Sequence, residues 1–348
     1  MQLKVAVYNM EWMRNLFFDG GVPKRIDDPD ETHRELGIRS AKLAEIVNKL
    51  DADILGIVEG PNTLADGSLT ASEQLESWRD LHGLNDNYRA VHGYPSGGEQ
   101  ELCCLYRSDK VAVEFTPETH GPRHPFNEPF LVDTTDTLIK EHYKHYRAPL
   151  ELTVKSVGSP DKELTRLIVA HSKSKGIFDS VDLARFEQLS ARNRRKLYAE
   201  CSSIRERCDQ WLSESIEPNV IVMGDINDGF GLDYYEQRLN RSAVETLLGD
   251  PWRPELILQH VLPKPKLKKF GWEPSSSQFT DRITGDRFNV LIDHLLVSRF
   301  IKVRSAAVWN PYLKDSAQDI KDLKEVLRSA SDHFPVICEC EIDAVSIA

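Results

Sequence analysis

Val220-Ile221-Val222-Met223-Gly224-Asp225-Ile226-Asn227-Asp228 joins a strand-sized apolar run to a carboxylate and a carboxamide. Apolar runs of this kind, bounded by turn-forming residues, are typical of buried strands. A strand that ends in an acidic or amide side chain delivers that group to the edge of a sheet, where active sites gather. An isolated aspartate at this place is more often a turn former or a helix cap, so the interpretation of Asp225 depends on the rest of the chain.

Short apolar runs recur along the whole chain and predict strands at Val5–Tyr8, Ile54–Val58, Leu102–Tyr106, Leu150–Val154, Leu167–Ala170, Val220–Met223, Val290–Val297 and Val336–Cys340. Helical periodicity lies between some of them. One apolar face consists of Ile38, Leu43, Ile46, Val47 and Leu50, and a longer one runs from Leu183 to Trp211. The stretch from Leu102 through Val113 has no room for a helix and predicts a hairpin-like succession. This mixture predicts an α/β architecture with mixed sheets.

Three irregular stretches hold much of the proline and glycine, and we expect them to be surface loops over a rigid scaffold: Phe17–His33, Pro117–Asp136 and Leu262–Asp286. No long linker and no internal repeat divides the chain, so we expect residues 1–348 to form a single domain.

The composition excludes several classes of protein. A net charge of −11 and a hydrophobic share of 40 % fit a globular protein with a sizeable core, and they exclude intrinsic disorder. The longest apolar runs fall well short of the roughly 20 residues that span a bilayer, so we expect no membrane partner.

The cysteines and the first residues bear on the compartment. The six cysteines show neither CxxC nor CxxH spacing, which argues against a zinc site or a redox motif. The start of the chain alternates like a strand and lacks the basic and apolar regions of a secretory leader. We therefore expect free thiols and a cytoplasmic protein. The oligomeric state is left open.

Polar residues with metal-binding or acid–base chemistry follow the predicted strands directly. They are Asn9, Glu11, Glu59, His171, Asp225, Asn227, Asp293, Asp332 and His333. Together they offer oxygen ligands and two histidines but no thiolate. Carboxylate and carboxamide oxygens suit Mg²⁺ or Mn²⁺ and not zinc or copper. A hard ion held by few carboxylates keeps positions for water and phosphate oxygens, so this set predicts phosphoester chemistry.

Six motifs give the chain a resemblance to the endonuclease/exonuclease/phosphatase superfamily. In the family's order they are Tyr8-Asn9-Met10-Glu11, Ile57-Val58-Glu59, Ala170-His171-Ser172, Met223-Gly224-Asp225-Ile226-Asn227-Asp228, Leu291-Ile292-Asp293-His294-Leu295-Leu296-Val297-Ser298 and Ser331-Asp332-His333-Phe334-Pro335-Val336. The resemblance covers almost the whole chain. It implies a four-layer sandwich of two mixed β-sheets flanked by helices, with the site at one end.

The resemblance also implies a metal site. Glu59 resembles the family's principal metal ligand, and Asn9, Glu11 and Asp332 resemble the residues that complete or support that site. The implied cofactor is Mg²⁺, with Mn²⁺ as an alternative.

The catalytic roles follow from the same resemblance. Asp225 is similar to the group that aligns or deprotonates the attacking water, and Asn227 to the carboxamide that holds the scissile phosphate. His333 resembles the histidine at the phosphate or leaving group, and Asp293 its orienting carboxylate. An adjacent carboxylate favours the charged imidazole and fixes its tautomer. His171 resembles the second histidine of the deoxyribonuclease-like branch.

Arg147 is similar to the arginine that contacts substrate phosphate in that branch. The branch also has a glutamate that orients the histidine matching His171, but Gln100 stands at that place here. Either Glu99 or Glu101 takes over after a one-residue slip, or Gln100 acts as a neutral partner.

The basic residues favour a nuclease. Lys173 and Lys175 lie just past His171, and we expect them to bind substrate. A second basic stretch consists of Lys264, Lys266, Lys268 and Lys269 and leads into Phe270 and Trp272. Lysines interleaved with aromatics suit a nucleic acid strand, although a solvated loop explains them equally well.

The sequence is compatible with three functions. The favoured one is a nuclease that acts on DNA or RNA by metal-assisted in-line attack of water. The alternative is a small-molecule phosphodiesterase or phosphatase of the inositol phosphate or sphingomyelin type. Lipid-cleaving enzymes would be expected to carry apolar surface loops, which the sequence does not make evident. A binding module without catalysis is disfavoured because every expected ligand type is present.

Overall fold

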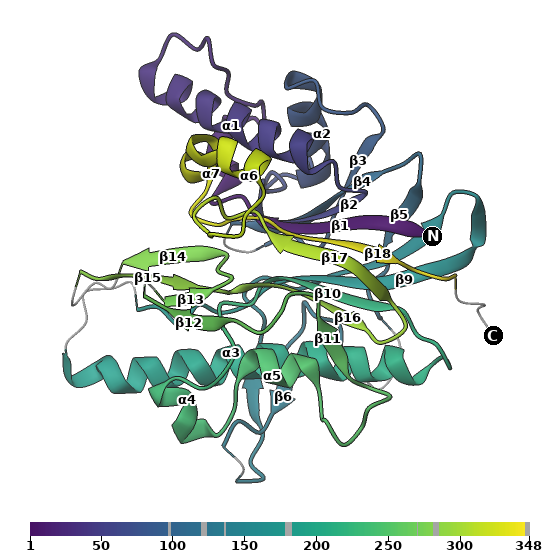
Figure 1. Ribbon diagram of the computed structural model, residues 1–348, viewed down its shortest axis with the longest axis vertical. Helices are drawn as coiled ribbons and strands as arrows, with labels where there is room; N and C mark the ends of the chain where they lie inside the picture. Colours follow the sequence, from purple (N-terminus) through teal and green to yellow (C-terminus); the bar gives the residue numbers. More distant parts are fainter. Residues whose placement is uncertain are drawn as a thin grey trace.

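The computed structural model describes residues 1–96, 99–119, 124–135, 137–177, 183–269, 271–280 and 285–344. Two six-stranded sheets pack face to face (Figure 1). The first sheet has the order β17 (Lys302–Val308), β18 (Val336–Glu341), β1 (Gln2–Asn9), β2 (Ile54–Gly60), β4 (Glu101–Arg107) and β3 (Tyr88–His92). The second has the order β11 (Leu258–His260), β16 (Asp293–Ser298), β10 (Val220–Asp225), β9 (Ser159–His171), β8 (Leu150–Ser156) and β5 (Val111–Phe115).

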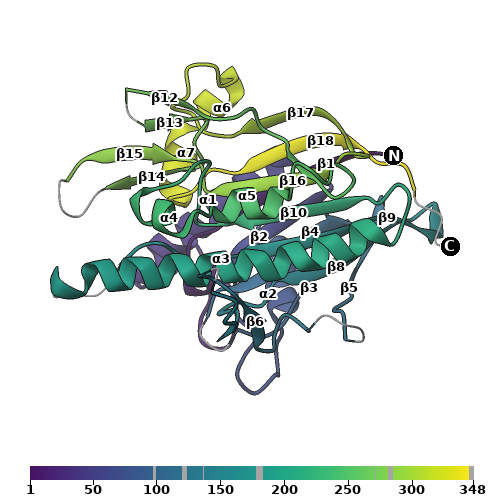
Figure 2. The same ribbon diagram turned by 90° about the horizontal axis from the view of Figure 1, so that it is seen from below.

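Helices cover the outer faces of both sheets (Figure 1). Those over the first sheet are α1 (Glu31–Leu50), α2 (Ala71–Leu81), α6 (Gln318–Asp322) and α7 (Lys324–Ala330). Those over the second sheet are α3 (Leu183–Ser213), α4 (Tyr234–Leu239) and α5 (Ala243–Leu248). Figure 2 shows α3 running along the second sheet. These layers form the expected four-layer α/β sandwich. None of the described helices is both long enough and apolar enough to cross a membrane.

Smaller elements complete the described chain. A four-stranded sheet has the order β12 (Lys266–Lys268), β13 (Gly271–Glu273), β15 (Arg287–Val290) and β14 (Ser277–Thr280). A two-stranded sheet pairs β6 (Phe130–Val132) with β7 (Glu141–Tyr143), and a 3-10 helix η1 spans Met13–Leu16.

The largest buried cluster lies between the two six-stranded sheets. It contains Val5 and Val7 of β1, Val169 of β9, and Ile221 and Met223 of β10, all of them buried. Burial of so many aliphatic side chains is the main favourable term for the fold. It holds the strand ends, and thus the polar residues that follow them, at fixed places.

Strand register brings the polar residues to one end of the sandwich. β10 runs parallel to β9, so that Asp225 pairs with His171, and antiparallel to β16, so that Asp225 also pairs with Asp293. In the first sheet, β1 and β2 run parallel, with Asn9 paired to Val58. Residues in register on neighbouring strands lie side by side, and both sheets therefore present chemical groups at the same end.

Four expectations about local structure are wrong. The Leu102–Val113 stretch is not a hairpin, because β3 already pairs with β4 and the chain crosses to β8 of the other sheet to form β5. The Val290–Val297 run is interrupted between β15 and β16, where the Ser276 hydroxyl accepts the backbone N–H bonds of Ile292 and Asp293.

The other two concern a predicted loop and a predicted helix face. Leu262–Asp286 contains β12, β13 and β14 and is not an irregular loop, since short strands without an apolar period leave little sequence signal. In α1, Leu43, Ile46, Val47 and Leu50 are buried as expected, but Ile38 is exposed.

Candidate active site

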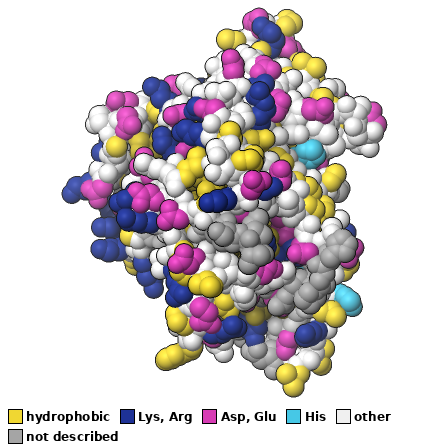
Figure 3. Space-filling model, turned by 90° about the vertical axis from the view of Figure 1, so that its right-hand side faces the viewer, with side chains coloured by type: hydrophobic (Ala, Val, Ile, Leu, Met, Phe, Trp, Pro, Cys, Tyr) yellow, Lys and Arg dark blue, Asp and Glu magenta, His cyan; other side chains and the backbone are white. Residues whose placement is uncertain are grey.

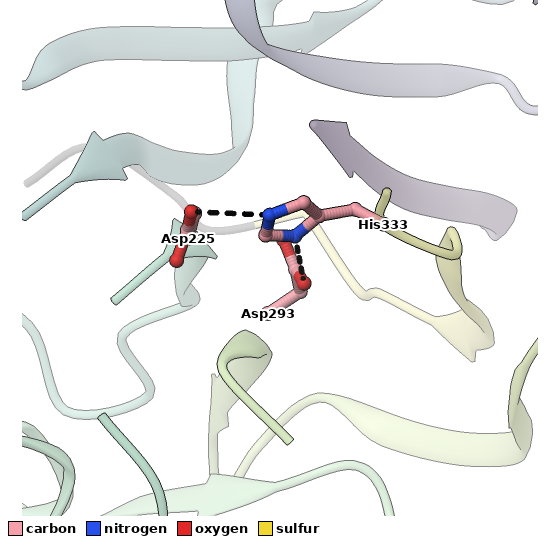
Figure 4. Close-up of side chains that lie close together, drawn as sticks. All are labelled: Asp225, Asp293 and His333. Carbon is pink, nitrogen blue, oxygen red and sulfur yellow. Dashed lines mark hydrogen bonds and ion pairs between the residues drawn. The ribbon is translucent and has the colours of Figure 1, made fainter. Parts of the chain in front are cut away.

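A buried group of three side chains lies where β10, β16 and the segment before β18 meet (Figure 4). The Nδ1 atom of His333 lies 2.7 Å from Oδ2 of Asp293, and its Nε2 atom lies 3.8 Å from Oδ2 of Asp225. One ligand atom from each residue lies within 4.8 Å of the others, close enough to hold a metal ion. The imidazole thus bridges two carboxylates inside the protein.

The surroundings shift the pKa values of His333 and Asp225 in this group. Burial opposes the charged form of His333, but the carboxylates of Asp293 and Asp225 outweigh it and raise the pKa of the imidazole well above its ordinary value. Burial raises the pKa of Asp225 to about 8; the Asp293 carboxylate adds to that rise, and His333 opposes it. The arrangement favours a charged imidazole beside a carboxyl group that titrates near neutral pH.

Backbone and amide donors fix the Asp225 carboxylate. The Asn9 side chain donates from Nδ2 to Oδ2 of Asp225 at 3.1 Å, and the backbone N–H of Asn227 donates to Oδ1 at 2.9 Å. The carboxamide of Asn227 donates to the backbone oxygen of Ser172 at 3.0 Å. Asn9 and Asn227 therefore hold the β10 turn in shape, and the oxygen of Asn9 accepts the N–H of Glu11 at 3.0 Å.

Three carboxylates, Glu11, Glu59 and Asp332, lie beside this group. The N–H of Trp12 donates to Oε2 of Glu59 at 2.8 Å, and the N–H of Asp332 donates to Oε2 of Glu11 at 3.0 Å. Burial raises the pKa of both glutamates, and the Asp332 carboxylate raises that of Glu11 further. A bound cation would favour the ionised form of these acids, and their oxygen donors fit Mg²⁺ or Mn²⁺.

Left-handed backbone occurs at several of these residues. Glu11, Glu59 and Asn227 have φ values of 46°, 59° and 56°. Non-glycine residues rarely adopt this conformation, which is energetically costly and clusters at functional sites. These backbone conformations occur at the ends of three strands that meet at the candidate active site.

His171 and Arg147 line the same end of the sandwich. The Nε2 atom of His171 lies 3.6 Å from Oδ2 of Asp225 and 3.8 Å from Oε1 of Glu59. Burial, Arg147 and His333 lower its pKa well below the ordinary value, which favours the neutral ring. Its Nδ1 atom is buried, with no hydrogen-bond partner among the described residues.

None of the three partners considered for His171 forms a hydrogen bond with it in the described residues. The carbonyl oxygen of Gln100 accepts a hydrogen bond from the guanidinium of Arg147, while Glu99 pairs with Arg14. Glu101 accepts a hydrogen bond from the Thr63 hydroxyl at 2.9 Å. Gln100 therefore orients the arginine and not the histidine.

Lys175 corrects a second expectation. Its amine pairs with Asp228, lies 2.6 Å from Oε1 of Glu236 and 3.4 Å from Oδ2 of Asp233. Burial opposes the charge of Lys175, but Asp228 and Glu236 raise its pKa above the ordinary value. A buried acidic cluster requires such a cation, so the contacts of Lys175 indicate a role in the fold and not the expected contact with substrate.

Lys173 does not share the acidic cluster that Lys175 contacts in the described residues, and its amine is half-buried. Its backbone N–H donates to Oε2 of Glu200 at 2.7 Å, and its half-buried amine has a pKa lowered first by burial and then by Lys196. Of the second basic stretch, Lys266 and Lys268 lie on β12, where both are exposed. Phe270 lies outside the described residues.

Residues that position the site escaped sequence reasoning. The Ser331 hydroxyl donates to the backbone oxygen of Asn9 at 2.8 Å and accepts the N–H of His333 at 3.1 Å. Ser276 and Ser277 are fully buried, and the Ser277 hydroxyl donates to the backbone oxygen of Asp332 at 2.8 Å. The triple serine Ser275–Ser277 was the available signal, because buried hydroxyls need partners.

The chain is similar to known proteins over nearly its full length. The sequence profile described as "Endonuclease/Exonuclease/phosphatase family" matches residues 25–333. Curated protein sequences gave no significant match.

Solved structures match at low identity. An endonuclease/exonuclease/phosphatase from Bacteroides vulgatus is 15 % identical with a TM-score of 0.50, and the match covers 99 % of this chain and 100 % of that one. A mannosyl-6-phosphatase from Bacteroides thetaiotaomicron is also 15 % identical with a TM-score of 0.50, covering 97 % and 99 % of the two chains. The human Nocturnin catalytic domain with bound sulfate is 12 % identical with a TM-score of 0.52, covering 98 % and 95 %. These likenesses show the fold.

Proposed function

This chain belongs to the endonuclease/exonuclease/phosphatase family and is a phosphoesterase of that family, and we propose that it hydrolyses phosphodiester bonds of a DNA or RNA strand with Mg²⁺ or Mn²⁺. The observation that carries the proposal is the buried His333 between Asp293 and Asp225, beside the carboxylates of Glu11 and Glu59. Such a set pairs a charged imidazole with a carboxylate of tuned pKa, which is the pairing that acid–base chemistry at a phosphate needs.

Asp225 acts on the attacking water. Its carboxylate is held by Asn9 and by the N–H of Asn227, and its pKa of about 8 suits a group that accepts a proton near neutral pH. The Nε2 atom of His333 faces the same oxygen at 3.8 Å. Water and phosphate bound next to both groups would thus have a proton acceptor and a proton donor within reach.

Asp293 and Arg147 complete the stabilisation of charge. Asp293 fixes the ring of His333 through Nδ1 and keeps it cationic, so that Nε2 donates to a phosphate or leaving-group oxygen. Arg147 is held by Gln100, which prepares its guanidinium for a phosphate oxygen. Glu59 and Glu11, supported by Asp332 and Asn9, would hold the metal ion, which supplies Lewis-acid stabilisation of the phosphoryl oxygens.

Charge supports a nucleic acid strand as substrate. Lys266 and Lys268 are exposed on β12, in the small sheet whose strand β14 reaches the site, although the whole chain carries −11. The opposite end of the sandwich shows acidic and basic side chains interspersed (Figure 3). β12 lies at the edge of that sheet opposite β14, so the charge would meet a polyanion that extends from the site across the small sheet.

We propose a cytoplasmic setting on the state of the cysteines. All six are free and buried. Buried thiols without disulfides are typical of a reducing compartment.

Hydrolysis assays on a panel of substrates test the function. The panel contains single- and double-stranded DNA, RNA, an inositol polyphosphate, a sugar phosphate and sphingomyelin, each with Mg²⁺, Mn²⁺ or EDTA. We expect metal-dependent cleavage of at least one nucleic acid and its loss in Asp225→Asn. Cleavage of only an inositol or sugar phosphate would instead support the small-molecule alternative.

A further inference from the structure

A basic cluster lies beside the active site, where the segment after His171 meets α3. Lys173 follows His171 by two residues, a span of at most about 7 Å. The N–H of Ser172, between them, donates to the backbone oxygen of Asp225 at 3.0 Å. The N–H of Lys173 donates to Oε2 of Glu200 on α3 at 2.7 Å. Lys173 is therefore anchored between the catalytic end of β10 and the helix.

The face of α3 that meets this segment carries two cations beside one buried acid. Arg192, Lys196 and Glu200 follow one another at intervals of four residues, so they share one side of the helix. The Lys196 ammonium lies 3.8 Å from Oε1 of Glu200, and its side chain is 31 % exposed. Arg192 is exposed one turn earlier. Arg194 is engaged elsewhere, because its guanidinium lies 2.8 Å from Oδ2 of Asp233.

The ring of Tyr146 joins this face to the arginine of the active site. The Lys196 ammonium lies 6.0 Å from the centre of that ring, and the guanidinium carbon of Arg147 lies 4.9 Å from it. A cation over an aromatic ring is attracted by the ring's negative face. Tyr146 is 52 % exposed, so the ring and its cations border on solvent. The basic face of α3 therefore continues directly from Arg147.

Positive charge at Lys173 is not balanced by the residues around it. Its half-buried amine forms no hydrogen bond or ion pair with any described side chain. Burial and the charge of Lys196 lower the pKa of this amine, Arg147 and Arg192 lower it further, and Glu200 opposes the fall. A partly desolvated charge without a partner costs free energy. An anion bound between Lys173 and Lys196 would remove that cost.

The chemistry of the cluster selects a phosphate group as this anion. Ammonium groups form strong, charge-assisted hydrogen bonds with phosphate oxygens, and one phosphate has enough oxygens to accept bonds from several cations together. Arg147 is assigned to the scissile phosphate in the proposed function, so the cations beyond it meet the next phosphate of the substrate. Lys175, on the same segment, has no such role because Asp228 and Glu236 neutralise it.

We propose that Lys173 and Lys196, with Arg192 at the rim, form a subsite for a second phosphate, the neighbour of the scissile phosphate in the substrate. The inference rests on the proposed function, since the neighbouring phosphate is taken to be that of a nucleic acid strand. It adds to that function a preference for substrates with two adjacent phosphates, and it assigns the preference to α3 and the segment after His171.

The kinetic test compares substrates that differ by one phosphate. One pair is thymidine 5′-(p-nitrophenyl phosphate) with and without a 3′-phosphate, and the other pair is the 3′-ester with and without a 5′-phosphate. In at least one pair, we expect the wild-type kcat/KM with Mg²⁺ to be about 5- to 100-fold higher for the substrate with the second phosphate. Lys173→Met and Lys196→Met should each reduce this ratio, and the double variant should bring it within about twofold of one.

Matched variants separate a local contact from net charge and from support of the fold. Lys173→Arg keeps the charge, and it should retain most of the preference. Lys49→Met removes one exposed charge from α1, over the other sheet, and should leave the ratio at the wild-type value. The melting temperature of Lys173→Met should not fall, because the change removes an unbalanced charge. A marked fall would assign Lys173 to the fold and overturn its place in the subsite. Lys173→Met and Lys173→Arg carry the test alone if the Lys196 variant fails to fold.

Binding of stable nucleotides gives a second readout that is independent of turnover. Calorimetry with Mg²⁺ compares thymidine 3′,5′-bisphosphate with the two thymidine monophosphates. We expect the wild-type protein to bind the bisphosphate at least about fivefold more tightly than either monophosphate, and the double variant to lose this difference. Equal affinities in the wild-type protein, or a difference that survives in the double variant, would overturn the subsite.

The outcomes distinguish the subsite from the proposed function. Cleavage of oligonucleotides together with equal kcat/KM within both ester pairs would overturn the subsite and leave the nuclease standing. Failure to cleave any nucleic acid would overturn the nuclease, and the calorimetric comparison would then decide the phosphate subsite by itself.

Discussion

Replacement of Asp293 by Asn should slow catalysis by acting through His333. The two side chains are almost fully buried, and the Asp293 Oδ2 to His333 Nδ1 distance is 2.7 Å. Hydrogen bonds to charged groups contribute about 1.5–3 kcal/mol, and 1.36 kcal/mol corresponds to a tenfold change in rate. We therefore expect Asp293→Asn to lower kcat by about 10- to 150-fold with little change in KM, because the contact keeps His333 oriented and protonated, and His333 stabilises the charge that develops on the leaving oxygen.

A double-mutant cycle identifies the route of this effect. His333→Ala removes both the contact with Asp293 and the group that faces Asp225, so we expect a fall of about 10²- to 10⁴-fold. Added to His333→Ala, the Asp293→Asn change should cost less than about threefold, since its partner is already gone. Steady-state kinetics on the four proteins at saturating Mg²⁺ give the coupling, and melting temperatures exclude unfolding. Full multiplication of the two single effects would refute the pairing.

Three further expectations concern the metal, the substrate and stability. Glu59→Gln should raise the Mg²⁺ concentration for half-maximal activity at least about tenfold without a change in melting temperature, and an unchanged Mg²⁺ titration would remove Glu59 from the metal site. Lys266→Gln with Lys268→Gln should flatten the log–log salt slope of nucleic acid binding by about 1.4 to 1.8, as measured by fluorescence anisotropy, whereas an unchanged slope would assign both lysines to solvent. Burial raises the pKa of Glu200 to about 7, against 4.5 for the ordinary side chain, so the folded state binds its proton more tightly than the unfolded state does. The free energy of unfolding should therefore fall by up to about 3 kcal/mol as the pH rises from 4.5 to 7. Urea unfolding of Glu200→Gln should lack that fall, and an identical pH profile for both proteins would contradict the assignment.

Local patterns predicted the α/β class and the strand ends, whereas the four layers followed from the resemblance to the family. Apolar runs at Val220–Met223 and Ile54–Val58 are buried strands, and the acids that follow them lie at the sheet edge as expected. Short apolar runs of this kind indicate buried strands, so the pattern alone identifies them. The gathering of Asp225, Asp293 and His333 was likewise expected from their places in the motifs.

Local sequence patterns do not predict contacts between residues that are far apart in the chain. A lysine placed just past His171 looks the same whether it meets a phosphate or a buried acid, and only the fold brings Lys175 to Asp228, 53 residues away. The orientation of Arg147 by Gln100 is another such contact. The strands β12 to β14 were missed because each has only three or four residues and no apolar period.

Product analysis in ¹⁸O-labelled water tests the central claim, metal-dependent hydrolysis of phosphodiester bonds by direct attack of water. Wild-type protein is incubated with Mg²⁺ and a single-stranded oligonucleotide, and the phosphate-bearing products are weighed by mass spectrometry. We expect one ¹⁸O atom per cleaved bond, no products in EDTA, and no products from Asp225→Asn. Cleavage that persists in EDTA, or products without the label, would contradict the assignment of the site.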